Sequence, residues 1–335
     1  MAGAWDGFFA IPYQLPEDRW LKRKYDKWAK HFGSKKVFPY RIDDWYIPNI
    51  SPKLSQIKKR VNPEVVLVEY VFMSKAFESF GPDILKILDT HDIFGGRQRL
   101  YIERGMIPQW FYTTIAQEKR ALDRADVILA IQEEETAYFR RFTQREVITV
   151  GHLAQVSGQS ESLESQVDRL LFVGSENPIN IVGLRWFLSE IFTRVRQEIP
   201  AIELDVVGKV ADHFAPQQGI NLIGPEQDLS PYYKRARIVV NPVRFGTGLK
   251  IKAIEALAHG RPLVTTKAGA AGLEKWEGKT FILADTPEEF AKAIVQVWTS
   301  PDLGTELTNQ ALKFVDTYNQ TALKPLLDTI ARVNT

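Results

Sequence analysis

The sequence contains no cysteine among its 335 residues, which excludes a disulfide framework and thiolate metal sites. It also lacks an excess of either charge, because 43 lysines and arginines stand against 41 aspartates and glutamates, a net charge of +2. No strong overall field therefore draws the protein to nucleic acid or to an acidic partner. No apolar run reaches the length of about 18 residues needed to span a membrane, and the first residues lack the basic head and apolar stretch of a signal peptide. These absences predict a cytoplasmic protein.

The sequence does contain short β-branched runs that alternate with helical patterns, which is typical of parallel sheets built from βαβ units. The length favours about two domains, and the polar segment 152–168 separates two series of such runs. We expect this segment to be the linker. The predicted strands lie within residues 64–70, 85–91, 125–131 and 145–151 in the first half, and within residues 168–174, 202–208, 236–242, 261–266 and 279–285 in the second.

Two helical patterns are informative. One follows the first strand of the second half and presents a single apolar stripe at helical spacing, which predicts core packing and not a cofactor site. Its members are Ile181, Leu184, Leu188, Ile191, Val195 and Ile199. The other, residues 19–36, combines eight lysines and arginines with four aromatic residues. It is either an amphipathic helix with its aromatic face in the core or a segment that rests on an anionic membrane surface.

Residues 244–264 place glycines and lysines at the start of a predicted helix. Positive charge is disfavoured at a helix N-terminus, so Lys250 and Lys252 need an outside reason, which a bound phosphate would supply. Gly246 and Gly248 would let the backbone approach such a ligand closely. The spacings of the Walker loop and of the dinucleotide fingerprint are absent. A glycine-rich turn with solvated lysines is the alternative.

The second half resembles the nucleotide-binding domain of the retaining GT-B glycosyltransferases of the group 1 or family 4 class. The resemblance is carried in order by "LLFVGSENPINIVGLRWFLSEIF", "LDVVGK", "INLIGPEQDLSPYYKRARIVVNPVRFGTGLKIKAIEALAHGRPLVTTKAGAAGL" and "EEFAKAI". The first half resembles the acceptor domain of that class through "DDWYIPNI", "PEVVLVEYVFMSKA", "DTHDIFGGR" and "DRADVILAIQEEE". The resemblance implies an α/β protein of GT-B architecture, with two Rossmann-like doubly wound parallel-sheet domains facing a cleft. Residues 1–155 would form the acceptor-side domain and residues 156–335 the nucleotide-sugar-binding domain, with the last helix returning to the first.

The activity implied by the resemblance is transfer of a sugar from a nucleotide donor to an acceptor hydroxyl with retention, in polysaccharide or glycoconjugate synthesis. Neither a metal nor another cofactor would be needed, and no Asp-x-Asp pair, the usual metal-diphosphate ligand of the other large transferase fold, occurs. The partners would be a nucleotide-diphosphate sugar and a saccharide or lipid-linked acceptor, without nucleic acid. Contact with the inner membrane face, a homo-oligomer and a partner subunit stay open. The alternatives are a glycogen-type phosphorylase, a nucleotide-sugar epimerase and a weak or inactive nucleotide-binding subunit that needs a partner.

The same resemblance assigns roles to residues in the second half. Glu255 falls on the second glutamate of the family's Glu-x7-Glu motif and would bind the ribose hydroxyls, while Thr247 stands in place of the first glutamate, near the sugar. Lys250, with Arg244, would neutralise the diphosphate, and Lys252 would be a solvated neighbour. Asp228 is either a neighbour of the base or the cap of the next helix. The nucleotide-sugar-binding candidates are Gly174, Ser175, Asp228, Leu229, Arg244, Gly246, Gly248, Leu249, Lys250 and Glu255.

In the first half, His91 and Asp92 lie at the carboxyl end of a predicted buried strand. The resembling family often places a histidine near the donor sugar at this point, so these two residues join Thr247 as catalytic candidates. Glu69 and Tyr70 end the preceding strand and are candidates for the acceptor side.

The front of the chain lacks the strand and glycine-rich loop with which the family's acceptor domain opens. We therefore expect the first one or two βα units to be absent, and residues 1–335 to come from a longer chain or to rely on another subunit. The alternative is that "GFFAIPY" fills the central strand, which Pro12 opposes because proline cannot donate to an interior ladder.

Overall fold

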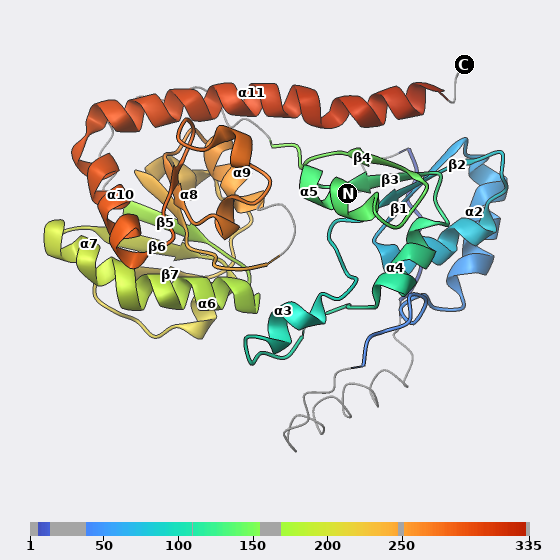
Figure 1. Cartoon of the computed structure of the whole chain (residues 1–335), viewed down its shortest axis with the longest axis horizontal. Helices are drawn as coiled ribbons and strands as arrows, with labels where there is room; N and C mark the ends of the chain where they lie inside the picture. The colour runs from blue at the N-terminus through green and yellow to red at the C-terminus, as the bar shows by residue number, and fades with distance from the viewer. Residues whose placement is uncertain (1–5, 14–37, 109, 155–168, 247–250, 333–335) are drawn as a thin grey trace. The chain divides into compact units, whose positions relative to one another are not determined.

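The computed structural model describes residues 6–13, 38–108, 110–154, 169–246 and 251–332. The chain divides into two compact units, one of residues 1–150 with 325–335 and one of residues 151–324 (Figure 1). The predicted boundary between residues 155 and 156 and the aromatic segment 19–36 lie outside the described residues.

The first unit is built on a four-stranded parallel sheet, in the order β1 (Val65–Glu69), β2 (Leu85–Asp89), β3 (Val127–Ala130) and β4 (Glu146–Thr149). Right-handed crossovers between neighbours in this sequential order put every connection on one face of the sheet. Among its described residues, the helices of the unit are α2 (Ile50–Val61), the 3-10 helix η1 (Val71–Ser79), α3 (Gln98–Ile102), α4 (Ile115–Leu122) and α5 (Glu133–Phe139).

Each face of this sheet has its own cover, because side chains alternate along a strand. Leu88 and Ile128 point to the face where η1, α4 and α5 contribute the largest core cluster of the unit. Ile87 and Leu129 point to the other face, where the end of the final helix α11 (Pro301–Ala331) packs through residues such as Ile330. The last turns of α11 thus complete the first unit.

Residues 7–13 contain no strand, so the alternative that "GFFAIPY" fills the central strand is wrong. Among the described strands, β1 lies at an edge of the sheet, and Leu67 within it is 45% exposed. The absence of the first βα units stays a prediction.

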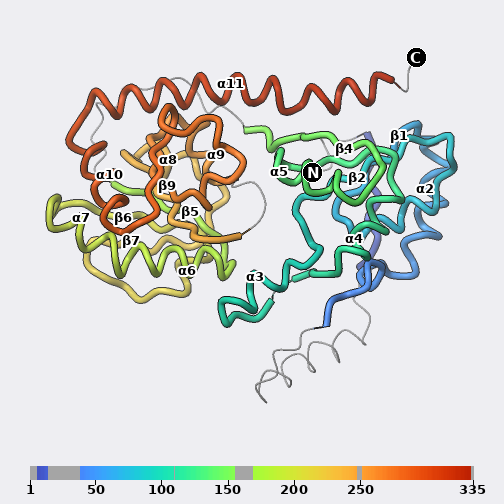
Figure 2. The backbone as a smooth tube through the Cα atoms, in the orientation of Figure 1, coloured from blue at the N-terminus to red at the C-terminus, as the bar shows by residue number. Residues whose placement is uncertain are grey.

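The second unit is a six-stranded parallel sheet whose strand order reverses between its central strands, the hallmark of a doubly wound sheet. The order is β10 (Ile282–Leu283), β9 (Leu263–Thr265), β8 (Ile238–Asn241), β5 (Arg169–Val173), β6 (Glu203–Val207) and β7 (Ile220–Ile223). Helices flank it on both sides, as the backbone trace shows (Figure 2). They are α6 (Pro178–Trp186), η2 (Phe187–Phe192), α7 (Thr193–Glu198), η3 (Lys209–His213), α8 (Ser230–Arg235), α9 (Ile251–Ala258), η4 (Ala268–Ala270), η5 (Glu274–Trp276) and α10 (Pro287–Thr299).

The predicted apolar stripe forms the buried face of one long helical rod, α6 to α7, which contains a π-helical turn at η2. Leu184, Ile191 and Val195 are fully buried, as the spacing predicts. A π-turn adds a residue to the turn and rotates the face that follows. This explains why Phe192, which the stripe omitted, is also in the core. Phe187, also omitted, precedes the shift and lies three residues after Leu184 on the same helix face.

Candidate functional site

The carboxyl ends of the parallel strands in the second unit meet at one edge of the sheet, where ligands of such sheets bind. The turn after β5 carries Gly174 and Ser175, and the turn after β6 carries Gly208 with φ of 104°. A Cβ on Gly208 would lie 2.3 Å from the carbonyl oxygen of Gly174, so glycine is required for these two turns to touch. Asn180 of α6 fixes the first turn, because its side-chain amide donates to the Ser175 carbonyl at 3.1 Å and to the Ser175 hydroxyl at 3.2 Å.

Lys252, on the first turn of α9, reaches this same turn. Its ammonium donates to Oδ1 of Asn180 and lies 5.0 Å from the centre of the Phe172 ring. The prediction that Lys252 is a solvated neighbour is therefore wrong: the side chain is half-buried and directed toward the end of β5. Helical spacing alone did not reveal this, because the partner Asn180 lies 72 residues away in the sequence.

Glu255 lies one turn further along α9 and is half-buried. Oε2 of its carboxylate accepts a hydrogen bond of 3.4 Å from the Tyr233 hydroxyl. Burial raises the pKa of the Glu255 carboxyl above its ordinary value, while the hydrogen bond from Tyr233 and the positive charge of Lys252 lower it. Lys252 thus interacts with Glu255 as well as with Asn180, the residue that holds the turn after β5.

Glu255 lines a cavity of about 430 Å³ within the second unit. This volume falls within the range of small-molecule sites. The connection between β7 and α8, helix α8 and helix α9 all contribute residues to the lining of the cavity. The lining residues are His152, Leu153, Ala154, Gln227, Leu229, Ser230, Tyr233, Glu255, Ala258 and His259.

The structure separates the two residues that were expected near the base. Leu229 lines the cavity together with Glu255. The carboxylate of the neighbouring Asp228 instead accepts the Ser230 N–H at 2.9 Å, at the start of α8. That hydrogen bond lowers the pKa of Asp228. The N-cap position that the sequence allowed for Asp228 is taken by Leu229, and Asp228 lies one residue before it.

Two histidines that sequence reasoning missed line the same cavity. The ring of His259 stacks on Tyr233, with centroids 4.2 Å apart and planes 9° apart. Burial lowers the pKa of His259 to about 4, with the charge of Arg261 acting in the same direction, so the ring is neutral at pH 7. Burial also lowers the pKa of His152. The spacing of Glu255 and His259, four residues apart on one helix face, was the available signal for the first.

The segment that follows β8 is held by side-chain hydrogen bonds at the point where it begins. The side chain of Asn241 donates to the Gly269 carbonyl at 2.8 Å, and the hydroxyl of Thr266 accepts the Gly269 N–H at 2.9 Å and donates to the Val243 carbonyl. Thr265 donates to the Asn241 carbonyl at 3.0 Å. The buried hydroxyls of β9 thus hold the start of the segment that leads to α9.

Arg244 and Gly246 lie further along this segment. Arg244 is exposed, and its guanidinium lies 4.9 Å from the centre of the Trp186 ring. Gly246 has φ of 121°, a backbone conformation that favours glycine. The other candidates in this segment, Thr247, Gly248, Leu249 and Lys250, lie outside the described residues.

In the first unit, the structure brings together three of the four candidates at the ends of β1 and β2, namely Glu69, Tyr70 and His91. Nε2 of His91 lies 3.9 Å from a Glu69 carboxylate oxygen and 3.8 Å from an Asp89 carboxylate oxygen, and the His91 ring lies 4.3 Å from that of Tyr70. Burial raises the pKa of Asp89, and the charge and the backbone N–H of His91 partly offset this increase. Asp92 is engaged elsewhere, because its carboxylate pairs with Arg97 at 2.6 Å.

A buried glutamate, Glu118 of α4, holds the loop that carries these residues. Its Oε1 accepts the Phe94 N–H at 2.6 Å, and its side chain is fully buried. Burial raises the pKa of Glu118 to about 7, although the N–H groups of Phe94 and Gly95 act in the opposite direction. A Cβ on Gly95 would lie 2.5 Å from Oε2 of Glu118, so the loop passes directly over the carboxyl.

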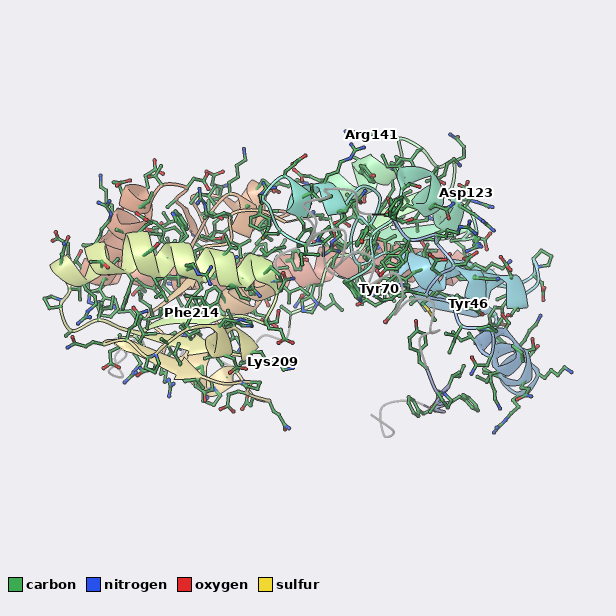
Figure 3. The ribbon with its side chains drawn as sticks, turned by 90° about the horizontal axis from the view of Figure 1, so that it is seen from below. Tyr46, Tyr70, Asp123, Arg141, Lys209 and Phe214 are labelled. Carbon is green, nitrogen blue, oxygen red and sulfur yellow. The ribbon has the colours of Figure 1, made fainter. Side chains whose placement is uncertain are left out.

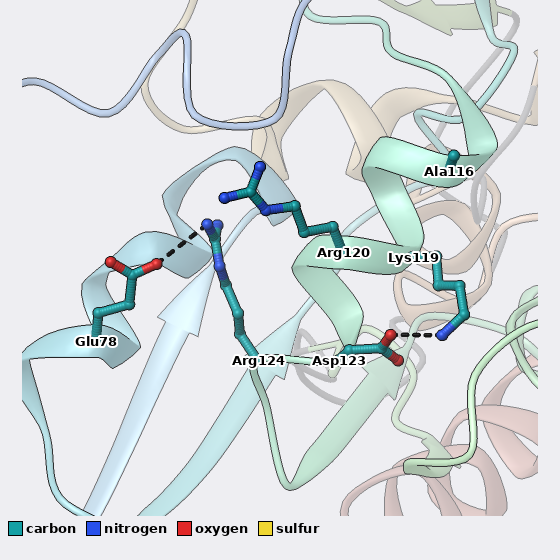
Figure 4. A pocket seen from close by; sticks show the side chains of 6 residues that line it. All are labelled: Glu78, Ala116, Lys119, Arg120, Asp123 and Arg124. Carbon is teal, nitrogen blue, oxygen red and sulfur yellow. Dashed lines mark hydrogen bonds and ion pairs between the residues drawn. The ribbon is translucent and has the colours of Figure 1, made fainter.

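A second hollow, of about 370 Å³, lies in the first unit beside α4 (Figure 4). The charged side chains around it are paired with one another: Arg124 with Glu78 at 3.2 Å and with Asp43 at 2.6 Å, and Lys119 with Asp123 at 2.5 Å. We assign no function to this hollow.

Comparison with known proteins adds to this geometry. Residues 167–300 match the family model described as glycosyl transferases group 1. An uncharacterised 44.6 kDa protein in the cps region of Klebsiella pneumoniae is 27% identical over 159 residues, which cover 44% of this chain and 41% of that protein. Glycosyltransferase 1 domain-containing protein 1 of Xenopus tropicalis is 26% identical over 153 residues, which cover 41% and 44%. The match thus spans less than half the length of either relative.

Among solved structures, TarM superposes with a TM-score of 0.65 at 14% identity, covering 82% of this chain and 57% of that one. Sucrose-phosphate synthase from Thermosynechococcus elongatus superposes with a TM-score of 0.63 at 16% identity, covering 85% and 77%. A pneumococcal O-GlcNAc transferase, GtfA, solved with UDP and GlcNAc, has a TM-score of 0.60 at 15% identity, covering 84% and 59%. At these identities the likeness establishes the fold, and the predicted GT-B architecture of two parallel-sheet α/β domains is confirmed. In the described part of the chain, no helix combines the length and apolarity that crossing a bilayer requires.

Proposed function

We propose that this chain, whose residues 167–300 match the model of group 1 glycosyl transferases, transfers a sugar from a nucleotide-sugar donor to an acceptor hydroxyl with retention of the anomeric configuration. The observation that carries the proposal is the cavity of about 430 Å³ in which Glu255 and Leu229 lie together. A carboxylate there can accept two hydroxyl hydrogen bonds from a ribose, and charge-assisted bonds of this kind are strong. The stacked Tyr233 and His259 rings stiffen the wall around it.

The diphosphate would lie beside the turn after β5. The backbone N–H of Ser175 lies there at a strand end, a common setting for phosphate, whereas the Gly174 N–H donates to the Val207 carbonyl at 2.9 Å. Lys252 brings a positive charge to the same turn through Asn180. Many members of the family carry a basic residue shortly after this strand, whereas "VGSENPIN" has none. In this proposal Lys252 adds its charge from α9 to those of Lys250 and Arg244, which the resemblance assigns to the diphosphate.

The reaction needs no protein nucleophile in this scheme. The acceptor hydroxyl attacks the anomeric carbon on the face from which the nucleoside diphosphate leaves, and the leaving phosphate oxygen takes the proton. The protein holds the donor, neutralises the charge that develops on the leaving group and positions the acceptor. We expect no resident metal or cofactor to take part. A role in polysaccharide assembly is supported by the similarity to a protein of a cps region.

The test is turnover of nucleotide sugars by the full chain, with and without saccharide acceptors, followed by mass spectrometry. The proposal predicts a glycosylated product that forms only when acceptor is present. The anomeric coupling constant in its NMR spectrum should report the same anomeric configuration as that of the donor. Donor consumption without acceptor would instead indicate an epimerase or hydrolase. Nucleotide binding without any turnover would indicate a subunit that requires a partner, and an inverted product would refute retention.

A further inference from the structure

An exposed tryptophan packs against a cluster of aromatic rings in the first unit. Trp110 is 45% exposed. Its ring contacts those of Tyr70 at 5.2 Å and 88°, Phe72 at 5.7 Å and 83°, and Phe94 at 5.6 Å and 65°. These edge-on contacts fix its orientation. A large rigid ring that is fixed in place and still exposed loses little entropy when it binds a ligand.

The backbone around this ring is strained at three points. Tyr70, His91 and Trp110 have φ of 68°, 59° and 63°, in the left-handed region that side chains with a Cβ rarely adopt. The rings of Trp110 and His91 both contact Tyr70. Strain of this kind persists only where the surrounding structure imposes it, and it clusters at ligand sites.

Acidic groups flank the aromatic rings. The side chain of Glu69, adjacent to Tyr70, is 64% exposed, and carboxylate oxygens of Glu69 and Asp89 lie 3.9 Å and 3.8 Å from Nε2 of His91. Figure 3 shows Tyr70 among a dense group of side chains in the first unit. An aromatic face beside carboxylates suits a molecule with an apolar C–H face and a rim of hydroxyl donors. Phosphate is disfavoured by the two carboxylates, and an alkyl chain would displace water from them without offering a hydrogen-bond donor.

We propose that Trp110, Tyr70 and Glu69 form a saccharide-binding site, in which a pyranose ring stacks on Trp110 and its hydroxyls donate to the Glu69 carboxylate. This site deepens the proposed function, because the bound saccharide is the acceptor. Binding of the sugar itself depends only on the described residues of the first unit.

The test uses saturation-transfer NMR titrations of the full chain with the methyl glycosides of glucose, galactose and N-acetylglucosamine, each added separately, and with 1-octanol. Trp110→Leu should weaken glycoside binding about five- to tenfold, and Trp110→Phe should retain most of it, because a ring can still stack. Neither substitution introduces a β-branched residue at the strained position. Glu69→Gln should weaken the same binding, and Ile107→Ala, an exposed apolar residue in the same loop, should leave it unchanged.

The outcomes separate this proposal from the proposed function. Equal glycoside binding by wild type and Trp110→Leu, no binding of any glycoside, or binding of octanol in preference to the glycosides overturns the saccharide site. A parallel titration with UDP, GDP and ADP reports on the second unit. Glycoside binding that needs Trp110, without binding of any nucleotide, would leave this site standing and refute the proposed function.

Discussion

Glu118 makes the stability of the first unit depend on pH in a way that the structure specifies. Its carboxyl is fully buried and has a pKa of about 7, against 4.5 for an exposed glutamate. The folded chain therefore keeps the proton up to about pH 7, whereas the unfolded chain releases it near pH 4.5. Between these values the folded state binds more protons, so the free energy of unfolding falls as the pH rises. At about 1.4 kcal/mol per pKa unit, the loss across this window is about 3 kcal/mol.

Glu118→Gln should abolish this dependence. The amide oxygen of glutamine can still accept the Phe94 N–H, and no proton is released as the pH rises. We expect the difference in free energy of unfolding between variant and wild type to shift by about 3 kcal/mol in favour of the variant between pH 4.5 and pH 7.5. Contributions from other titrating groups cancel in this difference. The measurement is urea unfolding at each pH. Hydrogen exchange of peptides from β2 and α4 serves as the probe, so that the free energy of unfolding of the first unit is obtained separately from that of the second.

The control for this experiment is Glu134→Gln, since Glu134 lies exposed on α5. Its curve should run parallel to that of the wild type across the whole range. If the Glu118→Gln curve also runs parallel to the wild type, the buried carboxyl does not titrate as described and the reasoning is refuted.

Two further predictions concern the second unit. Lys252→Ala should weaken binding of a nucleoside diphosphate by about 1.5–3 kcal/mol, the value of a charged hydrogen bond, whereas Lys252→Arg should retain most of the affinity. Calorimetric titration measures both. Equal affinities for the wild type and the two variants would show that Lys252 does not contact the nucleotide. Gly269→Ala should destabilise the unit by about 1–3 kcal/mol, because the new Cβ would lie 2.3 Å from the Thr265 hydroxyl and 2.8 Å from the Asn241 carbonyl oxygen. Gly304→Ala, which meets open space in α11, is its matched control, and equal urea midpoints for the two variants would contradict the packing argument.

Most of the strands could be predicted from the sequence because each is a short, nearly continuous apolar run, as buried parallel strands require. The exception is β7 (Ile220–Ile223), an edge strand that is half-buried over three of its four residues and contains Asn221. Its weak pattern reflects its place at the edge of the sheet. The apolar stripe of the long helix correctly predicted that Leu184, Ile191 and Val195 are buried. It omitted Phe192, which the π-turn brings into the core and which a 3.6-residue period does not anticipate.

The candidate site was only partly predictable. Glu255 and Leu229 could be chosen by motif, and the structure places both in one cavity. The contact of Lys252 with Asn180 and the cluster of rings around Trp110 depend on residues far apart in the sequence, brought together by the fold. Such contacts leave no local signal, since spacing along a helix reports only on neighbours three or four residues away.

The central claim is that the cavity of the second unit binds a nucleoside diphosphate through Glu255. Calorimetric titration of the full chain with UDP, GDP and ADP tests it directly, with Glu255→Ala and, as a matched control, Glu198→Ala, an exposed glutamate at the end of α7. The account predicts that at least one nucleotide binds the wild type, that Glu255→Ala loses about 1.5–3 kcal/mol of binding free energy, and that Glu198→Ala binds like the wild type. Binding of none of the three nucleotides, or equal affinities for the two variants, would contradict it.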